Sequence, residues 1–289
     1  MKLVNNPFHR PLAIIIAAIS LMAGCITLSA SLIEPQAHIA PDYPKIDIRE
    51  MLSKELLSKS DYDCLFLQTG LARSAIDELR VNHPDSTQRI LGFQGNFFSD
   101  IQYVCEKNSP ISSEESVVDI NGRYINGTQF ASLHNGDILI TKASHTYGWR
   151  NGHAALVVDA EKGLTLESVV LGTDSCVQDI GKWTNYPNFI QLRLRNSSED
   201  LMNRITQSAV IHLKNIPYDL TIGILSPKFK NSEQIRKTHC SHLVWTAFRN
   251  FCYDLDSDGG GLVTPKDIAN SPYLEVVQVF GVYPEEIWP

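Results

Sequence analysis

The chain lacks any cluster of basic residues. Its 289 residues carry 25 Lys and Arg against 32 Asp and Glu, a net charge of −7, and no run of Lys or Arg stands out. Proteins that bind nucleic acid usually present a basic patch, so no nucleic-acid partner is expected. Internal repeats and low-complexity tracts are also absent from the sequence. With 43% hydrophobic and 20% charged residues, the composition is that of an ordinary globular protein.

Cysteine is scarce, and the number of cysteines outside the N-terminal segment is odd, so they cannot all form disulfides with one another in an oxidising compartment. Six cysteines occur, and five remain when Cys25 is set aside: Cys64, Cys105, Cys176, Cys240 and Cys252. An odd number leaves at least one thiol free where disulfides form. If Cys240 is that thiol, the other four allow three pairings. Alternatively, they are buried and reduced, since a free Cys packs as a small hydrophobe.

The N-terminus has the pattern of an export signal. Lys2 and Arg10 precede an uncharged apolar run from Leu12 to Ile33. Within that run, residues 21–25 (LMAGC) resemble the bacterial lipobox, in which the Cys is lipidated, here Cys25. An uncleaved anchor is the main alternative, because about 20 apolar residues span a bilayer; simple cleavage is the third. Residues 1–33 therefore predict a protein of the cell envelope, tethered to the membrane outside the cytoplasm.

The remaining chain divides into a tether and two parts. Residues 34–45 contain three prolines, which break regular structure and predict a tether. Residues 46–132 have apolar residues at mixed three- and four-residue spacings, which predict a helical subdomain without chemistry of its own. Residues 133–289 predict an α+β domain with an antiparallel sheet and a core helix. Its expected strands are 138–141, 153–158, 165–170 and 192–194, and its expected helices are 201–213 and 240–251.

Cys240 lies where a helix would favour a thiolate. Apolar residues at 243, 244, 247, 248 and 251 form one stripe, and Cys240 comes one turn earlier on the same side. Unpaired N–H groups in the first turn of a helix stabilise an anion and lower the pKa of a thiol. A buried Cys that merely begins a core helix is the alternative.

His153 and Glu167 are expected on one face of a two-stranded hairpin. If Glu167 lies directly opposite His153, residues 158–162 form a five-residue loop. One face then carries an apolar surface, and the other carries His153, Thr165 and Glu167. The carboxylate would accept a hydrogen bond from one ring nitrogen, and the other nitrogen would take the proton of the thiol. A satisfied His at a strand start and an exposed Glu are the alternatives.

Together these segments resemble the permuted NlpC-type cysteine hydrolases, which are permuted papain-like amidases that include the YiiX-like amidases. The resemblance rests on Asn135–Leu139, Gly152-His153-Ala154, Glu167 and His239–Trp245, and it spans roughly Leu133 to Val279. As in the permuted branch, the His precedes the Cys in the chain. The resemblance implies Cys240 as nucleophile, His153 as base and Glu167 as the orienting residue. It also implies that Tyr218, in Ile216-Pro217-Tyr218-Asp219, assists an oxyanion hole.

The expected function is hydrolysis of an amide through a thioester, and the export signal suggests a cell-wall (peptidoglycan) peptide as substrate. A lipid amide or ester hydrolase or acyltransferase is one alternative, and a non-catalytic envelope-binding protein of the same fold is another. No cofactor and no metal are expected. Asp254, Asp256 and Asp258 begin like a calcium loop, but Pro265 stands where the loop needs a bidentate Glu.

Overall fold

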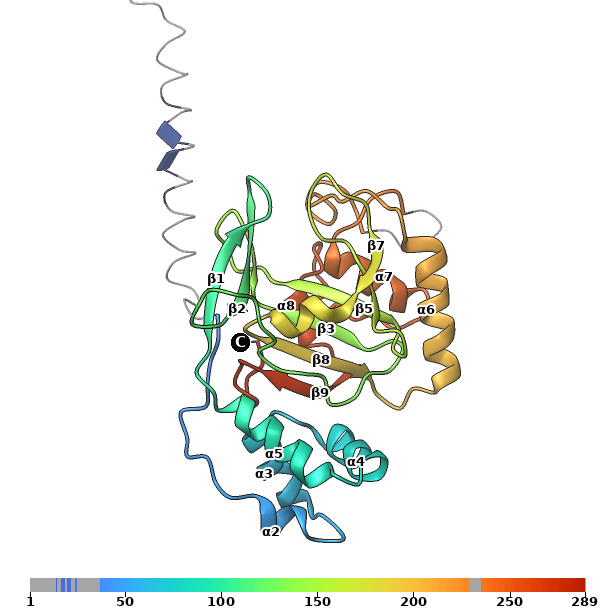
Figure 1. The fold of residues 1–289 in the computed structure, drawn as a ribbon. Helices are drawn as coiled ribbons and strands as arrows, with labels where there is room; N and C mark the ends of the chain where they lie inside the picture. The colour runs from blue at the N-terminus through green and yellow to red at the C-terminus, as the bar shows by residue number, and fades with distance from the viewer. Residues whose placement is uncertain are drawn as a thin grey trace, which may run out of the picture.

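The computed structural model describes residues 37–228 and 235–288, together with six single positions between 14 and 24. It is a mixed α and β protein with antiparallel sheets, which confirms the expected α+β class (Figure 1). Most of the predicted export segment, including Cys25, lies outside the described residues. Within the described part of the chain, no helix is both long enough and apolar enough to cross a membrane.

A six-stranded antiparallel sheet forms the centre of the molecule, with the strand order β7-β6-β5-β3-β8-β9. Its strands are β3 (Ile138–Thr141), β5 (His153–Asp159), β6 (Leu164–Glu167), β7 (Cys176–Asp179), β8 (Phe189–Leu194) and β9 (Leu274–Phe280). The strands expected near 138, 153, 165 and 192 are therefore present, and β6 ends earlier than expected.

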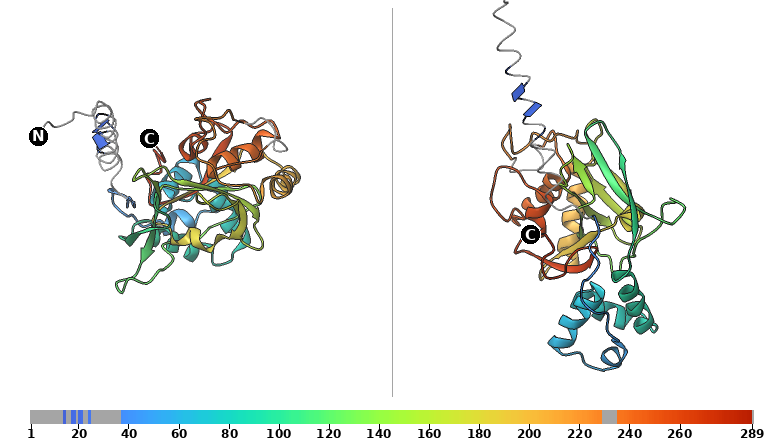
Figure 2. Two further views of the ribbon diagram at one scale, coloured as in Figure 1. Left: turned by 90° about the horizontal axis from the view of Figure 1, so that it is seen from above. Right: turned by 90° about the vertical axis from the view of Figure 1, so that its left-hand side faces the viewer.

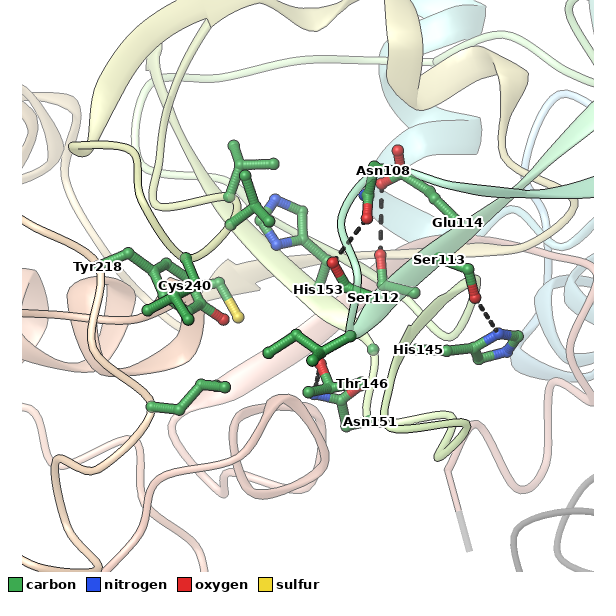
Figure 3. A pocket seen from close by; sticks show the side chains of 17 residues that line it. Asn108, Ser112, Ser113, Glu114, His145, Thr146, Asn151, His153, Tyr218 and Cys240 are labelled. Atoms are coloured by element: carbon green, nitrogen blue, oxygen red, sulfur yellow. Dashed lines mark hydrogen bonds between the residues drawn. The ribbon is translucent and has the colours of Figure 1, made fainter. Parts of the chain in front are cut away.

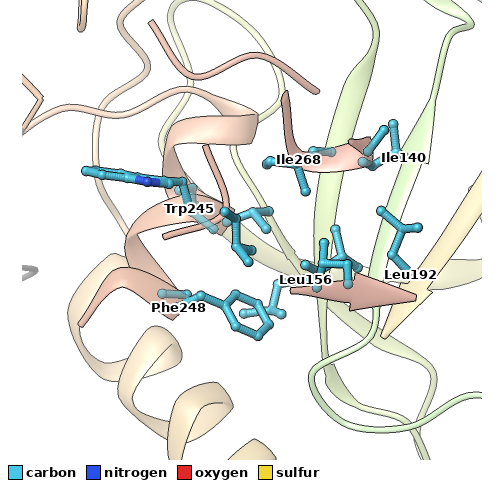
Figure 4. Packing of buried hydrophobic residues seen from close by; sticks show 14 of the residues in the cluster. Ile140, Leu156, Leu192, Trp245, Phe248 and Ile268 are labelled. Carbon is cyan, nitrogen blue, oxygen red and sulfur yellow. The ribbon is translucent and has the colours of Figure 1, made fainter. Parts of the chain in front are cut away.

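Both faces of this sheet are buried. Successive residues of β5 point to opposite faces, and each face packs into its own hydrophobic cluster. Ala154 and Leu156 belong to the larger core, and Ala155 and Val157 belong to a second cluster around Trp183. The helices α6 (Glu199–Leu213) and α7 (Cys240–Arg249) and the short α8 (Pro265–Ala269) supply the larger core. Figure 4 shows Phe248 and Trp245 of α7 beside Leu156 of the sheet. The 3-10 helix η1 (Ile180–Asn185) contributes Trp183 to the second cluster.

The hairpin of β5 and β6 has a different register from the one predicted. Leu156 lies opposite Leu166 and Val157 opposite Thr165, with an irregularity between Val157 and Asp159. The prediction that Glu167 lies directly opposite His153 is therefore wrong by two residues. A shift of two keeps every side chain on the same face, so His153 and Glu167 are diagonal neighbours rather than direct ones.

The N-terminal part is helical only to Phe97. The helices are α2 (Arg49–Leu52), α3 (Lys59–Thr69), α4 (Arg73–Asn82) and α5 (Ser86–Phe97), which lie at one end of the molecule (Figures 1 and 2). They are followed by the strands β1 (Gln102–Lys107) and β2 (Ser112–Val118), which form a second sheet with β4 (Ser144–Thr146) in the order β1-β2-β4. The prediction of helix throughout 46–132 is thus wrong for the hairpin, because exposed β1 shows no apolar alternation.

The helices are joined to the central sheet at its β9 edge. Ala72 N donates to Val277 O at 2.9 Å, and Val279 N donates to Gly70 O at 2.8 Å. Gly70 ends α3 with φ 70°, and a Cβ there would lie 2.1 Å from the carbonyl oxygen of Val279. Glycine is therefore required where this segment covers the exposed strand edge.

The core face of β5 provides a stability prediction. Leu156→Ala removes a side chain that is 0% exposed, and it should lower the free energy of unfolding by about 2–5 kcal/mol. Ile211→Ala is the control, because Ile211 is 73% exposed on α6 and should change stability by less than about 0.5 kcal/mol. Urea unfolding measures both. Equal stability of the two variants would contradict this assignment of the core.

Candidate active site

Cys240 is the first residue of α7, as expected. His239 is the N-cap, and its Nδ1 accepts a hydrogen bond from the backbone N–H of His242 at 3.4 Å. The stripe of α7 from Leu243 to Phe248 is buried, which holds the start of the helix against the sheet. The Cys240 side chain is therefore fixed beside the free N–H groups of the first turn, where negative charge is stabilised.

His153 and Glu167 are in contact in the sheet interior. His153 Nε2 and Glu167 Oε2 are 2.7 Å apart, and the two residues are 3% and 0% exposed. The other carboxylate oxygen, Oε1, accepts from Thr165 Oγ1 at 2.6 Å and from Trp183 Nε1 at 3.0 Å. Lys182 Nζ lies 3.5 Å from Oε2. Hydrogen bonds and an ion pair thus hold the carboxylate in one orientation.

The His153 ring is held from the side as well. Its plane stacks on Trp183 with 5.6 Å between ring centroids and 21° between planes. Because Nε2 bonds to Glu167, Nδ1 is the ring nitrogen that remains for the thiol.

Gly152 precedes His153 in the chain with φ 74°, and a Cβ there would lie 2.6 Å from the carbonyl oxygen of Thr141. The approach of β3 and the strand start therefore require glycine at this position.

The pKa values of the three groups move in the directions expected for an ion pair. Burial alone would lower the pKa of His153, but its hydrogen bonds and the charges of Cys240 and Glu167 raise the pKa to about 9. Burial likewise opposes ionisation of Cys240, yet His153 and His239 outweigh it and hold the thiol pKa well below its usual range. Despite burial, the His153 contact keeps the pKa of Glu167 far below that of an ordinary carboxyl. These directions favour a thiolate, an imidazolium and a carboxylate.

Tyr218 is joined to the segment that leads into α7. It forms a parallel bridge with Thr238, and the N–H of Thr238 donates to Pro217 O at 2.9 Å. Burial, followed by the charge of Cys240, raises the pKa of the Tyr218 phenol. The hydroxyl therefore stays protonated and available as a hydrogen-bond donor.

Cys240, His153 and Tyr218 line one narrow pocket of about 30 Å³ (Figure 3). In the figure, Cys240 and Tyr218 lie on one side of His153, and labelled residues of β2 and β4 lie on the other. Glu167 is not among the lining residues and reaches the pocket only through His153. Cys240, His153 and Tyr218 thus lie together at the pocket, and Glu167 contacts His153 from outside it.

The other residues singled out in the sequence lie apart from this pocket. The five described cysteines are all free thiols, as in the reduced alternative, but that alternative expected them to be buried, and Cys105 and Cys252 are exposed. Ligand atoms of Asp256, Asp258 and Asp267 lie within 4.8 Å of one another, but Lys228 pairs with Asp256 and Asp267 caps α8. Lipidation of Cys25 concerns a residue outside the described ones.

Two parts of the site were not predicted. Trp183 binds both His153 and Glu167 from a 3-10 helix that sequence periodicity does not reveal. A second group of side chains, Cys105, Glu115 and His145, has ligand atoms within 4.8 Å of one another on the β1-β2-β4 sheet. Arg150 holds both oxygens of Glu115, so this carboxylate is already in a buried ion pair.

Comparison with known proteins adds little to this description. No family model matches the chain, and no curated protein matches it. The crystal structure of the metalloprotein yiiX from Escherichia coli O157:H7 aligns with a TM-score of 0.39 and 14% identity, over 50% of this chain and 96% of that one. A similarity this low does not assign the chain to a family.

The reactivity of Cys240 tests the ion pair. Iodoacetamide should alkylate Cys240 with an apparent pKa well below the ordinary value of about 8.5, because the imidazolium of His153 stabilises the thiolate. Since the pKa of His153 is raised to about 9, this stabilisation should persist up to about pH 9 and be lost as the pH rises through that value. Glu167→Gln removes a charge that raises the pKa of His153, so the loss should begin at lower pH.

Peptide mapping of the alkylated chain distinguishes Cys240 from the other thiols, and Cys252→Ala serves as a control because Cys252 is exposed and does not line the pocket. Equal labelling of all five described cysteines would contradict the assignment, as would a loss of stabilisation that begins at the same pH in Glu167→Gln as in the wild type.

Proposed function

We propose that this protein is a cysteine hydrolase that cleaves an amide bond through a thioester on Cys240. The observation that carries the proposal is the buried contact of His153 with both Glu167 and the thiol at the start of α7. A nucleophile, a base in contact with it and a third group that orients the base form the arrangement used in covalent catalysis.

The geometry supports a mechanism in two halves. The Cys240 thiolate attacks the amide carbonyl, forming a C–S bond and a tetrahedral oxyanion. The backbone N–H of Cys240 and the protonated Tyr218 hydroxyl are the donors proposed for this oxyanion. The C–N bond then breaks as His153 gives its proton to the leaving amine. Water attacks the thioester, His153 takes the water proton, and the C–S bond breaks to release the acid and restore the thiolate.

A permuted papain-like arrangement is the proposed fold within the α+β class. The sheet carries the His, and a core helix packed on that sheet begins with the Cys, with the His first in the chain. The order and the antiparallel sheet support the resemblance to the NlpC-type hydrolases described above.

The proposed substrate is a cell-wall peptide, because the first 33 residues predict export. The same segment is the basis for proposing a membrane tether, with lipidation of Cys25 as its chemistry. Lipid labelling in cells tests the tether: the full-length chain should carry the label and fractionate with membranes, and Cys25→Ser should carry none. Label that persists in Cys25→Ser would rule out lipidation at that residue.

Turnover provides the direct test of the enzyme. Wild-type protein should release new fragments from cell-wall digests or N-acyl amides, detected by mass spectrometry, and Cys240→Ala should release none. Tyr218→Phe removes one oxyanion donor and should lower kcat by about 10²–10³-fold. Cys252→Ala should keep the wild-type rate, because this exposed thiol does not line the pocket.

Activity retained by Cys240→Ala would overturn the nucleophile assignment. A wild-type protein that binds these amides but never cleaves them would instead favour the non-catalytic envelope-binding alternative.

A further inference from the structure

The pocket around Cys240 has two walls of different chemistry. One wall is mainly polar and comes from the turn between β1 and β2, from β2 and from β4: Asn108, Ser112, Ser113, Glu114, Ser144 and Thr146, together with Ile111 and His145. The other wall includes Val169, Val170, Leu171 and Leu220. A substrate that contacts both walls must therefore have one polar end and one apolar end.

The apolar wall lies on the side of Tyr218 and Cys240. Tyr218 N donates to Thr173 O at 3.0 Å, and Thr173 N donates to Val170 O at 3.2 Å. These two bonds join the turn that follows Val170 to Tyr218, and Leu220 comes two residues after Tyr218. Leu171 is 54% exposed, so this apolar surface is open at the mouth of the pocket.

The polar wall lies on the other side of His153, as Figure 3 shows for Glu114, Ser112 and Asn108. In the proposed mechanism, His153 gives its proton to the leaving amine. The amine must therefore be next to His153, while the acyl carbon is bonded to Cys240. The amine end of the substrate then extends toward the polar wall, and the acyl end lies along the apolar wall.

Glu114 gives the polar wall a negative charge. Its Oε1 accepts hydrogen bonds from the Tyr186 hydroxyl and from Ser144 Oγ, the latter at 3.3 Å. Both donors are neutral hydroxyls, so they fix the carboxylate without neutralising it. Among the described residues that line the pocket there is no Lys or Arg.

Near the pocket, the charged groups of His153, Glu167 and Arg150 are paired. His153 faces both Cys240 and Glu167, and Lys182 lies 3.5 Å from Glu167. Arg150 pairs with Glu115. These pairs contribute little net field. His145 also lines the pocket, but burial lowers its pKa and favours the uncharged ring. Glu114 is therefore the charge that an incoming substrate meets on this wall.

We propose that this cleft selects amides with an apolar acyl end and a positively charged amine end, and that Glu114 is the residue that recognises the positive charge. The proposal rests on the proposed amidase function for its orientation. The Glu114 carboxylate would form an ion pair with an ammonium group of the leaving amine, and a carboxylate in that position would be repelled.

Charged thiol reagents test the field of Glu114 whether or not an amide is cleaved. Methanethiosulfonates bearing a trimethylammonioethyl, a methyl or a sulfonatoethyl group should modify Cys240 of the full chain with the cation faster, and the anion slower, than the uncharged methyl reagent. In Glu114→Gln the ratio of cation to anion rates should fall by about fivefold to tenfold. Glu161→Gln, an exposed site that does not line the pocket, should keep the wild-type ratio.

Amide probes test the orientation. N-octanoyl-lysinamide should be hydrolysed faster than N-octanoyl-glutaminamide and faster than N-acetyl-lysinamide, and Glu114→Gln should remove the first preference while keeping the second. A reagent ratio that Glu114→Gln leaves unchanged would overturn the role of Glu114. A short acyl group cleaved as fast as octanoyl would overturn the apolar acyl end. If no amide is cleaved but the reagent ratio depends on Glu114, the amidase proposal fails while the charge subsite stands.

Discussion

The hydrogen bond between His153 Nε2 and Glu167 Oε2 is the interaction on which the rest of the site depends. Two ionisable groups that are almost wholly buried are stable only as partners, and removing one of such a pair typically costs about 3–5 kcal/mol because the other charge stays buried. The same contact decides which ring nitrogen meets the thiol. Together with the hydrogen bond to Cys240, it outweighs burial and raises the pKa of His153 to about 9, which favours the imidazolium that stabilises the thiolate. The His153–Glu167 contact is thus needed both for the stability of the buried charges and for the reactivity of the thiol.

The surrounding architecture keeps that contact dry and aligned. The central sheet places His153 and Glu167 on the face of Trp183, whose indole stacks on one residue and donates to the other. On the opposite face, the apolar stripe of α7 packs into the larger core and fixes the position of Cys240 at the end of the sheet. The second sheet, through β2, β4 and the turn before β2, then adds the polar wall of the pocket. A rigid layer therefore holds the reacting groups, and a separate sheet shapes the space for the substrate.

Sequence patterns were sufficient for the elements with strong periodicity. The stripe in α7 predicted the helix start at Cys240, and the assumed hairpin pairing predicted the face shared by His153 and Glu167; both are present. The pairing register could not be predicted, because a two-residue shift leaves all side chains on the same faces. The strands β1 and β2 were missed because their residues are largely exposed or only partly buried. Trp183 and Glu114 come from segments distant in sequence, and only the fold brings them to the site.

The central claim is that Cys240 carries an acyl group during the reaction. Intact-mass measurement after mixing with an activated acyl donor, 4-nitrophenyl octanoate, tests it most directly, with peptide mapping to locate the adduct and hydroxylamine to identify a thioester. The account predicts one octanoyl group per chain, on Cys240, released by hydroxylamine and formed more slowly in His153→Ala and Glu167→Gln. Acylation that is spread over several residues, or that proceeds at the same rate in His153→Ala, would contradict it.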